Sequence, residues 1–272
     1  LYHAHALDTA SSGTYFASLD GKENRLLLKR EIPNATYGSG YLLYVRSRSL
    51  FAVPFDVRRQ EIVGESFPVP EKIAGDPSSG IGYFAAGVDG SFAFVPGTST
   101  SVESKLVLTD RKGAVTELPL PPRQYRFPRF SPDGSRIAFS IGSGRGADDE
   151  VWTYQLSGGG LTRLTFSGGN FSPIWSGDGT RLAFVSARAT NEGIYARSAD
   201  GSGAEEWIYG DFTARLPSDW SRDGKTLLFT HPSNQVWMAA LKGAWGPSSD
   251  SDKDSHMIEP GAYGGVFSPD DR

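Results

Sequence analysis

The sequence predicts an all-β fold, a six-bladed β-propeller whose blades are four-stranded antiparallel sheets. Three observations predict it: a segment recurs about every 45 residues, its clearest copies share an Asp-Gly pair, and short alternating runs typical of strands surround that pair. These copies are FSPDGSRIAFS at residues 130–140, WSGDGTRLAFV at 175–185 and WSRDGKTLLFT at 220–230. Fainter copies lie at residues 87–95 and 267–272.

The spacing of the repeat sets the number of blades. Its aspartates are Asp89, Asp133, Asp178, Asp223 and Asp270, so successive copies are 44, 45, 45 and 47 residues apart, and 272 residues hold six units. Helical repeats of similar length would show apolar residues every 3.6 positions, and this chain has no such window. Because the aspartates recur in the same turn, we expect them to stabilise the fold and not to act in catalysis.

Each unit contains the elements of one blade. Asp-Gly predicts a tight hairpin turn between the first two strands, because glycine accepts a positive φ and aspartate tolerates it. Third strands are expected at residues 151–156, 194–199 and 236–241. Polar fourth strands are expected after glycine-rich or aspartate-rich turns, at residues 161–165 and 205–208. The second unit departs from the pattern: Gly38-Ser39-Gly40 replaces Asp-Gly, and its fourth strand, expected near residues 66–69, is poorly marked.

The two ends of the chain are expected to complete one blade. Residues 1–6 stand where a second strand belongs, residues 14–19 and 24–28 supply the third and fourth strands, and residues 262–267 match the first strand. Such a clasp would remove the sheet edges that an open ring exposes. The chain is then one domain over residues 1–272, with blades at 1–30 plus 261–272, 33–72, 80–120, 124–167, 169–210 and 213–260.

Composition excludes several classes of function. The chain has no cysteine, and its 27 basic and 31 acidic residues are interspersed, with a net charge of −4. This distribution argues against a nucleic-acid surface and against a polybasic membrane patch. No apolar run approaches the 18 residues of a membrane span, so we expect no membrane contact by this segment. Both ends resemble cuts, and we expect a longer native polypeptide.

No motif predicts catalysis, a cofactor or a metal. His3 and His5 alternate on one expected strand, but a third metal ligand is not evident nearby. The carboxylates of residues 250–254 suggest calcium, yet the EF-hand spacing fails because Ser255 replaces its glycine and Gly261 its glutamate. The Gly-x-Ser-x-Gly, phosphate-loop and His-Glu-x-x-His motifs are absent.

A ligand site is expected at the mouth of the central channel. Loops that join the outer strand of one blade to the inner strand of the next gather there, and aromatic and arginine residues are enriched at binding hot spots. These loops hold Tyr37, Tyr83, Tyr125, Arg126, Phe171, Phe212, Arg215 and Tyr263. Arg129 and Asp219 occupy matching inner-strand positions and are expected on the channel wall. The alternative is that the loop residues only pack between blades.

The repeat resembles a known family. SPDGSRIAF at residues 131–139 and WSGDGTRLAF at 175–184 resemble the WD40-like PD40 propellers of the TolB type. Residues 13–23, and residues 40–45 with 50–56, resemble more specifically the C-terminal propeller of bacterial membrane-anchored serine/threonine protein kinases. That resemblance implies a cytoplasmic kinase domain, one membrane helix and a propeller outside the cytoplasm, periplasmic or at the cell surface. The kinase motifs themselves do not occur in this chain.

The sequence therefore favours a non-catalytic propeller, a sensor or interaction module that recognises a protein, peptide or glycan at its channel mouth. One alternative is an enzyme: the substrate-gating propeller of a prolyl-oligopeptidase-like peptidase, or a propeller with its own hydrolase or lyase site. A third possibility is a purely structural scaffold.

Overall fold

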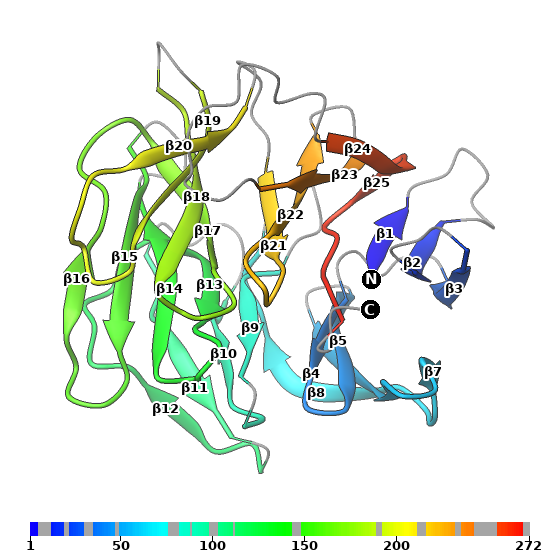
Figure 1. The fold of residues 1–272 in the computed structure, drawn as a ribbon. Coiled ribbons are helices and arrows are strands. Elements are labelled where there is room, and N and C mark those ends of the chain that lie inside the picture. The colour runs from blue at the N-terminus through cyan, green and yellow to red at the C-terminus, as the bar shows by residue number, and fades with distance from the viewer. Residues whose placement is uncertain are drawn as a thin grey trace.

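The chain folds into six antiparallel sheets arranged as the blades of a propeller (Figure 1). The computed structural model describes residues 1–4, 12–18, 22–29, 35–46, 49–75, 82–87, 89–97, 103–110, 112–142, 148–188, 192–210, 216–231, 235–241 and 255–268. All regular elements of these residues are strands. The prediction of an all-β, six-bladed propeller is confirmed.

Four blades follow one another along the chain, each with four strands that run in order from the channel to the outer edge. The third and fourth blades contain β9 (Phe84–Ala86), β10 (Phe92–Phe94), β11 (Val107–Thr109), β12 (Val115–Glu117), β13 (Tyr125–Phe130), β14 (Arg136–Ile141), β15 (Glu150–Gln155) and β16 (Leu161–Arg163). The fifth and sixth blades contain β17 (Asn170–Trp175), β18 (Arg181–Ser186), β19 (Gly193–Ser198), β20 (Glu206–Tyr209), β21 (Leu216–Trp220), β22 (Thr226–His231), β23 (Gln235–Ala240) and β24 (Ser255–Pro260).

The second blade differs from the others in its outer edge. Its inner strands are β4 (Thr36–Gly38), β5 (Tyr41–Arg46) and β6 (Ser49–Asp56). Two strands then share the outer position, because β7 (Glu61–Ile62) pairs with the end of β6 and β8 (Phe67–Lys72) pairs with its beginning. The poorly marked fourth strand is therefore present, as β8.

The first blade is built from both ends of the chain. Its order is β25 (Ala262–Tyr263), β1 (Tyr2–Ala4), β2 (Gly13–Ala17) and β3 (Asn24–Lys29). Ala4 pairs with Ala262 in the β1–β25 ladder. Beyond the ladder, the amino group of Leu1 donates to the carbonyl oxygen of Val266 at 2.7 Å, and the Val266 N–H donates back to the Leu1 carbonyl at 2.7 Å. The predicted clasp is confirmed.

The Asp-Gly turns are held by a repeated set of hydrogen bonds. Asp133 accepts from the Ser131 hydroxyl at 2.5 Å and from the Ser135 backbone N–H at 3.1 Å, and Gly134 between them has φ 70°. The hydrogen bonds from Ser131 and Ser135 lower the pKa of Asp133 to about 2. The same Ser-to-Asp bond and backbone N–H bond recur at Asp178 and Asp223. These carboxylates stabilise turns, as their repetition predicts.

The core lies between the blades. A phenylalanine occupies the same position in four successive second strands and is fully buried in each: Phe94, Phe139, Phe184 and Phe229. Burying one such side chain contributes roughly 1.5–3 kcal/mol. The repeat therefore encodes the contact between blades as well as the turn within each blade.

Candidate functional site

The central channel contains a cavity of about 520 Å³. It is lined by the inner strands β4, β9, β13, β17 and β21 and by the segment that follows β25. The lining residues lie mainly at the ends of these strands, beside the turns to the second strands, so the cavity lies toward that end of the channel. They include Tyr37, Phe84, Arg129, Phe130, Ile174, Trp175, Ser218, Asp219, Trp220, Val266 and Phe267.

Two β-bulges position Arg129 and Asp219 in this cavity. The pairing of β13 with β14 shifts between Arg126 and Arg129, where Phe127 has φ 51°. The pairing of β21 with β22 shifts between Pro217 and Asp219. A bulge adds a residue to one strand and changes the direction in which the following side chains point. Both Arg129 and Asp219 follow such a shift and line the channel, where the sequence predicts them.

Arg129 is a half-buried cation without an ion-pair partner among the residues that the structure describes. Its Nη1 donates to the carbonyl oxygen of Pro128 at 3.0 Å. Burial lowers the pKa of Arg129, and the negative charge of Asp219 opposes this effect. Removing a charge from water without a close counter-ion is costly. The guanidinium is therefore suited to receive an anionic group.

Asp219 is engaged by the backbone. Its Oδ1 accepts from the Trp220 N–H and its Oδ2 from the Phe267 N–H, both at 2.8 Å. Burial raises the pKa of Asp219 to about 6, and these two hydrogen bonds and the charges of Arg129 and the Leu1 amino group oppose the rise. Since Phe267 follows β25, Asp219 attaches the C-terminal segment to the channel wall.

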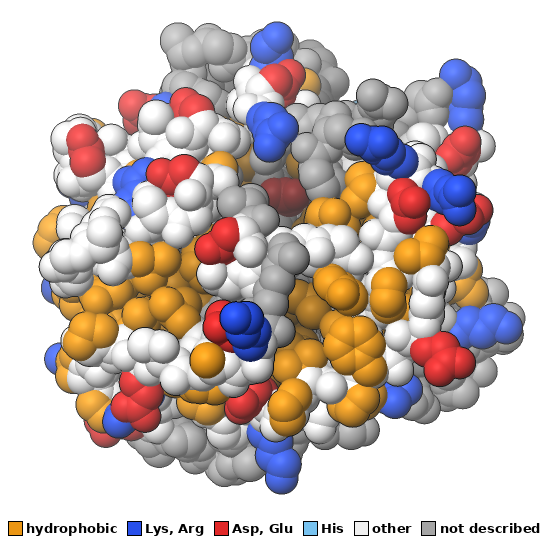
Figure 2. All heavy atoms as spheres, turned by 90° about the horizontal axis from the view of Figure 1, so that it is seen from below, with side chains coloured by type: hydrophobic (Ala, Val, Ile, Leu, Met, Phe, Trp, Pro, Cys, Tyr) orange, Lys and Arg blue, Asp and Glu red, His pale blue; other side chains and the backbone are white. Residues whose placement is uncertain are grey.

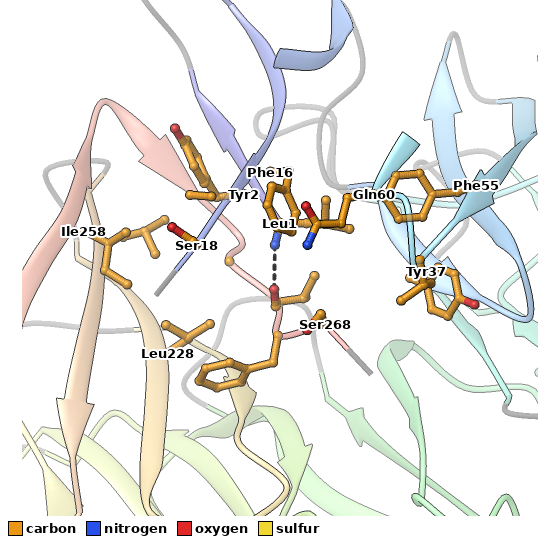
Figure 3. A pocket seen from close by; sticks show the side chains of 16 residues that line it. Leu1, Tyr2, Phe16, Ser18, Tyr37, Phe55, Gln60, Leu228, Ile258 and Ser268 are labelled. Atoms are coloured by element: carbon orange, nitrogen blue, oxygen red, sulfur yellow. Dashed lines mark hydrogen bonds between the residues drawn. The ribbon is translucent and has the colours of Figure 1, made fainter. Parts of the chain in front are cut away.

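A second, smaller pocket lies beside the clasp. Its volume is about 60 Å³, and it is lined by the first blade, by the second blade through Tyr37 and Phe55, and by the sixth blade through Leu228. Figure 3 shows these side chains around the hydrogen bond between Leu1 and Val266. Tyr37 and residues 266–268 line both this pocket and the channel cavity.

Four of the predicted site residues that the structure describes, Tyr83, Tyr125, Arg126 and Phe171, are not among the residues that line the cavity. Arg126 donates through Nε to the Tyr83 hydroxyl at 3.2 Å and through Nη1 to buried Asp149 at 3.2 Å. Tyr83 packs edge-on against Phe127 with ring centroids 5.4 Å apart, and Phe127 lies 6.4 Å from Phe171. These contacts join the third, fourth and fifth blades.

Tyr125 also packs within the fold. It is buried, its hydroxyl donates to the Pro121 carbonyl at 2.6 Å, and its ring meets Phe139 edge-on. Phe212 and Arg215 lie outside the described residues, as does the side chain of Tyr263. The acidic segment at residues 250–254 and His5 lie outside them too.

Sequence reasoning did not select the tryptophans beside the turns. Trp175 and Trp220 line the cavity but are largely buried, and the Trp175 Nε1 donates to the Arg129 carbonyl at 3.0 Å. The guanidinium of Arg136 covers the Trp175 ring at 4.6 Å. An aromatic residue directly before the Ser-x-Asp-Gly turn is the signal that could have found them.

The surface carries charges of both signs. On the face shown in Figure 2, basic and acidic side chains are interspersed with hydrophobic ones. Within the described ranges, no group of three His, Asp or Glu side chains is placed to hold a metal ion. The described residues also contain no helix of the length and apolarity needed to cross a membrane.

Comparisons with known proteins agree with this architecture. The Tol-Pal system protein TolB of Anaeromyxobacter dehalogenans (strain 2CP-C) is 41% identical over 103 residues, 38% of this chain and 23% of that protein. The uncharacterized peptidase YuxL of Bacillus subtilis (strain 168) is 30% identical over 109 residues, 38% of this chain and 16% of that protein. The matches thus span less than a quarter of either relative.

Solved structures show the same fold. A TolB candidate from Agrobacterium tumefaciens superposes with a TM-score of 0.70 at 19% identity, covering 95% of this chain and 96% of that one. The family model described as the TolB beta propeller domain, PD40, matches residues 98–249, which is more than half of the chain. The chain therefore belongs to the PD40 family of TolB β-propeller domains.

Proposed function

We propose that this chain is a non-catalytic binding propeller, which holds part of a protein, peptide or glycan ligand in its central channel. The observation that carries the proposal is the cavity of about 520 Å³ with the guanidinium of Arg129 on its wall, which has no ion-pair partner within the described part of the chain. Ligand sites are typically concave, largely apolar and supplied with a few polar groups, and cavities of roughly 300–1,000 Å³ are usual. The channel fits that description.

The place of this propeller in a larger protein is part of the proposal. The resemblance of residues 13–23, and of residues 40–45 with 50–56, to kinase-associated propellers supports a membrane-anchored signalling protein with the propeller outside the cytoplasm as its sensor. The kinase activity would then belong to another part of that polypeptide. A second candidate is the substrate-gating propeller of a peptidase, which the similarity to YuxL favours.

Selection of ligands by the chain and by a variant with an obstructed cavity tests the proposal. Thr36 is half-buried and lines the cavity, so Thr36→Trp would place an indole in it. Val115→Trp adds the same group to the exposed outer strand β12 and serves as the matched control. Random heptapeptides on phage and a panel of oligosaccharides would be screened against all three proteins, with folding checked by thermal unfolding.

We expect ligands that bind the parent chain and the Val115→Trp variant and that lose most of their affinity for the Thr36→Trp variant. A binding role for the channel would be contradicted if the screen selected no ligand, or if the selected ligands bound the Thr36→Trp variant as tightly as the parent chain. Hydrolysis of a prolyl peptide by this chain alone would contradict the assignment as non-catalytic.

A further inference from the structure

Arg129 offers one kind of interaction to the cavity. Its guanidinium donates to a neutral carbonyl, that of Pro128, and the other donors among its five N–H groups have no carboxylate within ion-pair distance among the described residues. Guanidinium groups bind carboxylates through paired hydrogen bonds, and these are stronger than bonds between neutral groups. A carboxylate on the ligand would supply the missing counter-ion.

The acid already present in the channel is less available. Both oxygens of Asp219 accept backbone N–H bonds, from Trp220 and Phe267, so this side chain serves the wall of the channel. It attracts Arg129 through space but makes no ion pair with it. The cavity wall also includes Arg222, which is exposed, so Arg129 is the half-buried cation of the wall, and its remaining N–H groups are open to a ligand.

The rest of the wall favours a peptide over a sugar. Apolar side chains from several blades line it, namely Phe84, Ala85, Phe130, Ile174, Val266 and Phe267, beside the hydroxyls of Thr36, Ser39, Ser131, Ser218 and Ser268. A hydroxyl-rich sugar would leave polar groups without partners where it meets the apolar side chains, and each unsatisfied group is costly. The apolar side chains of a peptide would instead gain by leaving water.

We propose that the channel ligand is an acidic peptide segment, in which an Asp or Glu carboxylate pairs with the guanidinium of Arg129 and neighbouring apolar side chains contact the cavity wall. This assignment rests on the proposed function, because it names the chemistry of the ligand for the same cavity. It requires no bond to form or break, and it makes Arg129 a residue that determines specificity.

The experiment uses the heptapeptides whose binding the Thr36→Trp variant abolishes. These are expected to be enriched in Asp and Glu relative to the starting library. The selection is repeated on Arg129→Gln, which should lose the enrichment, and on Arg123→Gln, which removes an exposed arginine outside the cavity and should keep it. Replacing the selected Glu by Gln in a synthetic peptide should weaken its binding to the parent chain at least about ten-fold, the usual effect of losing a charged hydrogen bond.

The outcomes separate the two levels of the proposal. A screen in which neither peptides nor oligosaccharides bind in a cavity-dependent way contradicts the binding function itself. Cavity-dependent peptides without acidic enrichment, or with equal affinity for the parent chain and Arg129→Gln, overturn the inference and leave the binding function standing. Binding of a uronic acid oligosaccharide without selection of any acidic peptide would also overturn the inference and leave the binding function standing. If Arg129→Gln does not fold, the Glu-to-Gln peptide pair measured on the parent chain decides the question.

Discussion

The titration of Asp219 gives a quantitative test of the channel wall. Its pKa is raised from 3.8 to about 6 in the folded chain because it is buried. Between these two values the folded state holds a proton that the unfolded state has released, so stability falls as the pH rises through this window. A pKa that differs by 1 between the folded and unfolded chains corresponds to about 1.4 kcal/mol, so the contribution of Asp219 between pH 4 and pH 7 is about 2–3 kcal/mol.

The assay compares the chain with its Asp219→Asn variant, in which this position does not titrate. The free energy of unfolding is measured by urea denaturation between pH 4 and pH 7. The stability of the parent chain relative to the variant should fall by about 2–3 kcal/mol as the pH rises. The amino group of Leu1, whose pKa burial lowers to about 6, titrates in the same window and interacts with Asp219, so both proteins are measured with this amino group acetylated.

Asp133→Asn is the matched control, because hydrogen bonds lower the pKa of Asp133 to about 2. Its contribution is present above pH 3.8 and is lost as the pH falls toward 2, so this variant should show a constant difference between pH 4 and pH 7. A constant difference for Asp219→Asn as well would refute the reasoning, since it would mean that water reaches the carboxylate as freely as in the unfolded chain.

Three further changes test the turns, the clasp and the small pocket. Asp178→Ala removes the acceptor of bonds from Ser176 at 2.6 Å and from the Thr180 N–H at 3.0 Å, and urea denaturation should show a loss of about 1–2 kcal/mol; unchanged stability would contradict a structural role. Tyr2→Ala removes a buried ring stacked on Tyr15 at 5.4 Å, which should cost about 3–5 kcal/mol and produce aggregates in size-exclusion chromatography. The equally buried Tyr154→Ala should destabilise without aggregation, and the clasp would be unnecessary if both variants stayed monomeric. Ala17→Val fills part of the 60 Å³ pocket and should stabilise the chain by about 0.5–1 kcal/mol; a lower melting temperature would mean that the pocket cannot accept the added groups.

The sequence could predict the features that depend on a short, repeated segment. The Asp-Gly turn needs only the residues from Ser131 to Arg136, and it recurs, so blade number and ring closure follow from its spacing. The split outer edge of the second blade could not be predicted in this way. Here β7 and β8 pair with opposite ends of the long strand β6. This pairing depends on tertiary contacts and not on the local sequence of either strand.

The inner-strand positions of Arg129 and Asp219 predict the channel wall correctly, but the end of the channel at which the cavity lies could not be predicted. The position of Arg129 depends on a bulge in which Phe127 has a positive φ. Phenylalanine rarely adopts this conformation, so the sequence gives no sign that a bulge lies there. Tyr83, Arg126 and Phe171 are of the types that bind ligands, yet their contacts join neighbouring blades. Aromatic and arginine residues serve binding and packing equally well, so composition alone cannot separate the two roles.

The composite blade has a consequence for how the chain is made. Three of its strands come from the first 29 residues, whereas the strand that pairs with β1 begins at Ala262. During synthesis the edge of β1 stays unpaired until Ala262 and Tyr263 have left the ribosome, and contacts between such distant segments form slowly. Unpaired strand edges promote association with other chains. Association of this chain with other chains is therefore expected mainly in the interval before β25 can pair with β1.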